Sequence, residues 1–168
     1  MTALDTIREA MTRYLNENGV AAVTAWPEEN RARPQGAVAA VSLRGCEGEN
    51  AGFQNYLGER YNQERGRWEE LYGRRVTLTF GLDLYAGTGG TEGERQVRAA
   101  FDRMAEALHQ GGPDGLKIKS LSCGETDYDR TVERYRCPAE AVCEAFLYAV
   151  ADEGGTFLEF EVKGAAQF

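Results

Sequence analysis

The sequence is poor in the residues that most enzymes use for acid–base and metal chemistry. It has one histidine, His109, and none of its four cysteines stands in a C-x-x-C pair. A zinc site built from paired cysteines therefore has no ligand pattern to start from. No serine lies in a nucleophile-elbow motif. From these absences we expect no catalytic residues, no metal and no cofactor, and we interpret His109 as a cation at the end of a helix.

Basic charge and long apolar runs are also scarce. The chain has 19 Lys and Arg against 27 Asp and Glu, which gives a formal net charge of −8. Because phosphate contacts need a basic surface, sequence-specific nucleic acid and anionic lipid are not expected partners. The longest apolar run, residues 145–151, is far below the roughly twenty residues that cross a bilayer. We also expect no signal peptide, and folding in the cytoplasm, where the cysteines would stay reduced; a disulfide between two of them is left open.

Two local patterns match known ion or phosphate sites only in part. Residues 87–93 form a glycine-rich run before a helix, but the run lacks the Lys-Ser/Thr ending of a phosphate loop. Glu125, Asp127 and Asp129 are spaced like part of a calcium loop, without its glycine and terminal glutamate. We interpret both patterns as turns. A weak divalent-cation site near Asp127 and Asp129 stays an alternative.

The periodicity of apolar residues predicts an α+β fold. Residues 2–18 and 94–110 each carry an apolar stripe at helical spacing. The expected strands are residues 22–26, 37–44, 75–85, 116–123, 135–152 with an interruption near Pro138, and 156–163. Helices and strands in separate runs favour an antiparallel β-sheet with the two main helices packed on one face. We expect one domain over residues 1–168.

Residues 52–73 have neither helical nor strand periodicity, and we predict a long loop there between two strands. Loops of this length in compact domains usually have a function. This one combines aromatic residues with arginine, the residue types that anchor protein interfaces. We therefore predict that it is a protein-contact arm, with contact residues Phe53, Tyr56, Tyr61, Arg67, Trp68 and Tyr72.

Most of the chain resembles the tail terminator (tail completion) proteins of tailed phages and prophages. Four segments carry the resemblance: the opening helix around residues 4–15, the strand VTLTFGLDLYA from Val76, the helix ERQVRAAFDRMAEAL from Glu94, and the closing GGTFLEFEVKG from Gly154. Other neck and tail components share much of this pattern of elements.

The resemblance implies a structural virion protein without catalytic residues. It implies a homo-oligomeric ring, with a hexamer as the expected form, that caps the finished tail tube and joins it to the head connector. The partners would be further copies of the chain, the tail-tube protein and the head-connector protein, and assembly would take place in the bacterial cytoplasm.

Two other functions remain open at this stage. The chain could be a monomeric adaptor or regulatory binding protein that uses residues 52–73 to hold one partner. It could also be an enzyme with a site that no motif shows, which a concave pocket of convergent polar side chains would support.

Overall fold

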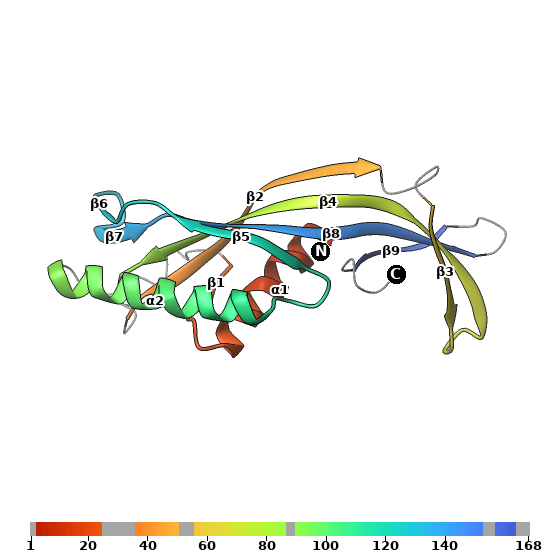
Figure 1. Cartoon of the computed structure of the whole chain (residues 1–168), viewed down its shortest axis with the longest axis horizontal. Helices are drawn as coiled ribbons and strands as arrows, with labels where there is room; N and C mark the ends of the chain where they lie inside the picture. Colours follow the sequence, from red (N-terminus) through yellow and green to blue (C-terminus); the bar gives the residue numbers. More distant parts are fainter. Residues whose placement is uncertain (1–2, 25–35, 51–55, 87–89, 153–156, 164–168) are drawn as a thin grey trace.

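The computed structural model describes residues 3–24, 36–50, 56–86, 90–152 and 157–163. Over these residues the chain forms two helices and nine strands, all of the strands in one sheet (Figure 1). In chain order these are α1 (Ala3–Glu17), β1 (Ala22–Val23), β2 (Val38–Asn50), β3 (Tyr56–Asn62), β4 (Arg67–Tyr85), α2 (Gly90–Gln110), β5 (Lys117–Cys123), β6 (Asp127–Asp129), β7 (Arg134–Cys137), β8 (Ala139–Asp152) and β9 (Phe157–Lys163). The α+β fold predicted from the sequence is confirmed.

The sheet is built around β4, which has 19 residues. Its C-terminal part lies between β2 and β8, and its last two residues pair with β7. Its N-terminal part lies between β3 and β8, with β9 on the far side of β8. These pairs are antiparallel, and the short β1–β2 pair is parallel. The molecule is therefore elongated, with a helix-covered body at one end and an all-β extension at the other (Figure 1).

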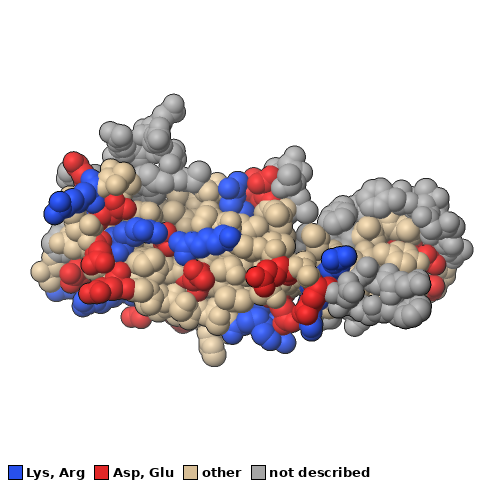
Figure 2. All heavy atoms as spheres, turned by 90° about the horizontal axis from the view of Figure 1, so that it is seen from above, with Lys and Arg blue, Asp and Glu red and all other residues tan. Residues whose placement is uncertain are grey.

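One face of the body carries charged side chains. Asp83 on β4 is 8% exposed and accepts hydrogen bonds from Arg44 on β2, at 2.6 Å, and from Arg136 on β7. Arg44 also binds Glu140 on β8, at 3.1 Å. Basic and acidic side chains are interspersed over the surface seen from above (Figure 2). Such a mixed surface favours solubility over the binding of a strongly charged partner.

A glycine lets the Arg44 side chain lie flat on the sheet. A Cβ atom at Gly81 would stand 2.6 Å from Arg44 Nε and 2.4 Å from Ser42 Oγ, closer than real contacts allow. Gly81 is opposite Ser42 on β2 and Glu140 on β8, so it forms the floor of this charged cluster. The ion pairs of Arg44 thus depend on glycine at position 81 as well as on the charged side chains.

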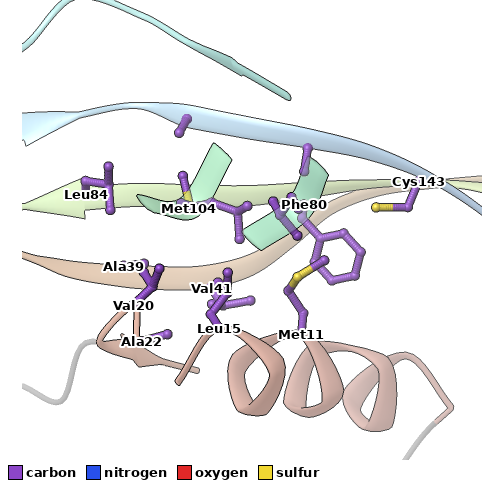
Figure 3. Close-up of a cluster of buried hydrophobic side chains, with 14 of the residues drawn as sticks. Met11, Leu15, Val20, Ala22, Ala39, Val41, Phe80, Leu84, Met104 and Cys143 are labelled. Carbon is purple, nitrogen blue, oxygen red and sulfur yellow. The ribbon is translucent and has the colours of Figure 1, made fainter. Parts of the chain in front are cut away.

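Both helices cover the other face of the body, where the apolar residues of β4 point. Val76, Leu78, Phe80, Leu82 and Leu84 are all buried, as their alternation along the sequence predicts. They pack with Met11 and Leu15 of α1, Met104 of α2 and Cys143 of β8 in one hydrophobic core (Figure 3). The helices also contact each other, because the Tyr14 hydroxyl of α1 donates to the Ala107 carbonyl of α2 at 2.7 Å. The predicted placement of the two helices on one face is confirmed.

The extension has a small hydrophobic cluster of its own. Leu71 on β4 and Val150 on β8 are buried in it, with Leu57 and Phe146 packed against them. A bulge in β3 between Tyr56 and Gly58 lies beside this cluster. Among the side chains whose burial the structure describes, this cluster is much smaller than the core of the body, so strand pairing and polar contacts carry more of the stability here.

The predicted loop over residues 52–73 is wrong: its described part is a β-hairpin. β3 pairs with the start of β4 from Tyr56↔Tyr72 to Asn62↔Arg67. The four residues between the strands include Gly66, whose φ of 61° is one that glycine tolerates best. The strand pattern escapes detection because apolar side chains lie on both faces, Leu71 on one and Trp68 and Tyr72 on the other, so no simple alternation results.

Smaller differences concern the ends of strands. β2 continues to Asn50, past the expected end at residue 44, and β6 falls where only a turn was expected. The break near Pro138 is confirmed, since it separates β7 from β8. Within the described residues, neither helix is long and apolar enough to span a membrane.

Candidate protein-contact surface

The hairpin of β3 and β4 presents one face that consists of aromatic and acidic side chains. Three directly opposed pairs make this face: Tyr56 with Tyr72, Glu59 with Glu70, and Tyr61 with Trp68. Because side chains alternate along a strand, these six residues share a side of the hairpin while Glu69 and Leu71 point to the other. We call the six residues, Tyr56, Glu59, Tyr61, Trp68, Glu70 and Tyr72, the aromatic face.

The aromatic rings form two cross-strand pairs. The centroids of Tyr56 and Tyr72 lie 5.4 Å apart with an angle of 61° between the rings. Those of Tyr61 and Trp68 lie 5.5 Å apart at 65°. Both are edge-to-face arrangements, the geometry that aromatic quadrupoles favour. Each ring thus contacts its partner across the hairpin.

The four rings are nevertheless exposed. Tyr61 and Trp68 keep 51% and 49% of their surface in solvent, and Tyr56 and Tyr72 keep 38% and 37%. Such large aromatic residues contribute most when they are buried at an interface. A group of them on one face of a projecting hairpin forms an exposed apolar patch, a feature that interaction sites often have.

The two carboxylates on the aromatic face are associated with its tyrosines. The Tyr72 hydroxyl donates a hydrogen bond to Glu70 Oε2 at 2.8 Å, and this bond, with partial burial and the charge of Glu70, raises the pKa of Tyr72. Partial burial, followed by the charge of Glu59 and a hydrogen bond to it, raises the pKa of Tyr56. Both tyrosines therefore stay neutral hydroxyl donors at neutral pH, and the negative charge of the face stays on the two glutamates.

On the opposite side of the hairpin, Glu69 holds the two strands and the turn together through its buried carboxylate, which has no exposed surface. Its carboxylate accepts hydrogen bonds from Arg60 Nε and Asn62 Nδ2, both at 3.0 Å, and Arg65 lies 3.5 Å away. Burial alone would raise the pKa of Glu69, but the hydrogen bonds from Arg60 and Asn62 and the nearby positive charges outweigh it and hold the pKa below its usual value. Glu69 thereby holds Arg60 and Arg65 on the side of the hairpin away from the aromatic face.

Acid is expected to weaken the contacts of Glu69 with Arg60, Asn62 and Arg65. Because the folded-state pKa of Glu69 is lowered, its stabilising contribution is complete above the unfolded value, about 4.3, and is lost as the pH falls through the lower folded value. Glu69→Gln should remove this acid dependence and weaken the hairpin already at neutral pH. Fluorescence of Trp68, in a chain whose Trp26 is replaced by phenylalanine, measures both effects. Glu64→Gln, in the exposed turn, is the control, and an identical acid transition in the two variants would contradict the prediction.

The structure brings most of the predicted contact residues together. Tyr56, Tyr61, Trp68 and Tyr72 all lie on the aromatic face. Arg67 begins β4 opposite Asn62, so alternation places it on the side of Glu69. Phe53 lies outside the described residues. The sequence reasoning did not include the acidic pair of the aromatic face, which only the strand register reveals.

Other residues considered in the sequence lie apart from this surface. Asp127 and Asp129 belong to β6, opposite Arg136 and Arg134 in register. Within the described ranges, no group of three or more histidine, cysteine, aspartate or glutamate side chains could hold a metal ion. His109 is in the last turn of α2, as expected.

All four cysteines are free in this structure. Cys46 and Cys123 are exposed, whereas Cys137 and Cys143 are buried. Burial raises the pKa of the Cys143 thiol to about 12. Cys143 is therefore a hydrophobic core residue and not a reactive thiol.

No family model matches the chain, and no curated protein matches it. Among solved structures, the chain is similar to the sheath/tube terminator of an extracellular contractile injection system, PVC, in its extended state. The two are 10% identical with a TM-score of 0.49, and the match covers 100% of this chain. It covers 64% of the other chain, so the present chain spans less than two thirds of that neighbour's length.

Proposed function

We propose that this protein is a structural, non-enzymatic component of a phage-type tail, which caps or completes the tail tube as a homo-oligomeric ring and joins it to the head connector. The observation that carries the proposal is the aromatic face, four exposed rings held in pairs on a hairpin that projects from the helix-covered body. The resemblance of the sequence to tail terminators is the reason for proposing a phage-type tail as the assembly.

The shape of the chain suits such a ring. In a closed ring each subunit uses one surface to contact a different surface of its neighbour. The aromatic face lies at one end of the elongated molecule, and the helix-covered body lies at the other (Figure 1). An extended hairpin can therefore reach a neighbouring subunit, or a tube or connector protein, while the body keeps its own core.

The mass of the protein in solution tests this proposal. Light scattering coupled to size exclusion, followed by negative-stain imaging of any large species, is expected to show a ring about six times the mass of the chain, which is 18.5 kDa. If the protein alone is a monomer, the same measurement is repeated with tail-tube protein added. A protein that stays monomeric with the tube protein present would contradict the proposal and favour a monomeric adaptor that uses the same hairpin.

A further inference from the structure

We propose that the aromatic face binds an arginine-bearing segment of a partner protein, with the guanidinium group held by Glu59 and Glu70 between the two ring pairs. This inference deepens the proposed function and rests on one part of it, namely that the hairpin contacts another protein chain. It adds the chemistry of the segment that is bound.

The first argument is the charge of the face. Glu59 and Glu70 stand directly opposite each other on the two strands. Like charges in this position destabilise a hairpin, and natural sequences usually avoid them. Of the arginines on this hairpin, Arg60 and Arg65 are bound to Glu69 on the other side, and alternation places Arg67 on that side as well. A positive group from another chain would remove this repulsion, and an acidic or apolar segment would not.

The second argument is the order of the residues along the face. The acidic pair lies between the two aromatic pairs, which are separated by four positions on β4 and so by roughly 13 Å. That spacing leaves room for one side chain to enter between the ring pairs and reach the carboxylates. A cation beside the face of a tyrosine or tryptophan ring is attracted by the π-electrons, and arginine makes this contact more often than lysine.

The third argument separates arginine from other positive groups. The guanidinium group is planar, so it can stack on a ring while its N–H groups donate to carboxylates on either side. The tyrosine hydroxyls direct their hydrogen atoms to the same two carboxylates, which keeps the carboxylates in place. The face is therefore complementary to arginine in charge and hydrogen bonding.

The test uses the full chain with Trp26→Phe, so that Trp68 is the one remaining tryptophan of the two in the sequence. The probe is a capped Gly-Arg-Gly-Arg-Gly peptide, titrated into the millimolar range at low salt. Its matched control replaces each arginine by citrulline, which has nearly the same shape and no charge. We expect a saturable change in Trp68 fluorescence with the arginine peptide, weakened by added salt, and a much smaller response to the citrulline peptide.

Two variants locate the binding. Glu59→Gln with Glu70→Gln should weaken binding of the arginine peptide by about tenfold, as expected for the loss of two carboxylate contacts, one exposed and one half-buried. Glu64→Gln with Glu125→Gln removes the same charge from exposed positions off the aromatic face and should leave the affinity unchanged. Absence of saturation, equal binding of the two peptides, or equal effects of the two double variants would each overturn the inference.

The ring assay separates this inference from the proposed function. If the glutamine variant still assembles and Trp68→Ala with Tyr72→Ala does not, the hairpin is a contact arm whose partner segment is not basic. If neither variant affects assembly, the role of the hairpin itself is refuted.

Discussion

Phe80→Ala is expected to lower the free energy of unfolding by about 3–5 kcal/mol, because it removes a large side chain that has no exposed surface. Phe80 lies in the C-terminal half of β4, in the core formed with α1 and β8 (Figure 3). The cavity that remains is bounded by Met11 on α1 and other core residues that cannot fully close it. Chemical denaturation, followed by circular dichroism, measures the loss.

The control for Phe80→Ala is Leu71→Ala in the smaller cluster of the extension. Leu71 is 4% exposed and lies in a cluster separate from the core under the helices, so its loss is expected to loosen the hairpin with less effect on the helices. Hydrogen exchange separates the two outcomes, because Phe80→Ala should speed exchange in the helices and Leu71→Ala mainly in β3. Equal effects on the helices would show that the body and the extension unfold as one unit.

Trp68→Ala together with Tyr72→Ala is expected to abolish ring assembly and to lower the free energy of unfolding by only about 1–3 kcal/mol. The double variant breaks both ring pairs of the aromatic face, each worth about 0.5–1.5 kcal/mol beyond its buried area. An interface built on these anchors would lose several times as much, since central aromatic residues dominate binding. Size exclusion with light scattering measures assembly, and thermal denaturation measures the fold.

Tyr128→Ala is the matched control for that double variant. Tyr128 is 49% exposed and makes an edge-to-face pair with Tyr135, 5.4 Å apart, on β6 and β7. Its removal breaks one ring pair instead of two, so it should lower stability by about half as much and leave assembly intact. A sharp fall in the melting temperature of the Trp68 and Tyr72 variant, with the oligomer intact, would mean that these rings serve the fold and not an interface.

The sequence predicts the body of the fold because the body has one core. The residues of β4 from Val76 to Leu84 alternate cleanly, since one face meets the helices and the other meets charged side chains. The stripe of α2 is equally regular, and Val97, Met104 and Leu108 are all buried. Where a single face carries the apolar residues, as it does from Val76 to Leu84, the hydrophobic period can be interpreted directly even though Asp83 on the other face is also buried.

The extension could not be predicted in the same way. Its apolar residues are divided between a small buried cluster and an exposed face, so Leu71 and Tyr72 stand side by side in the sequence. The composition indicated a contact surface, but the opposition of Glu59 and Glu70 depends on strand register, which composition does not contain. The cluster of Asp83 with Arg44 and Arg136 was also missed, because its members come from three strands far apart in the chain.

The continuity of β4 has a mechanical consequence. The same strand contributes Phe80 to the core under the helices and Trp68 to the aromatic face, and β8 pairs with it from Glu69 to Gly81. The hairpin is therefore the outer end of the long paired strands β4 and β8, whose inner end lies in the core of the body. This strand pairing fixes the direction of the hairpin when the chain folds, so a partner that bound the aromatic face would lose little entropy in aligning it.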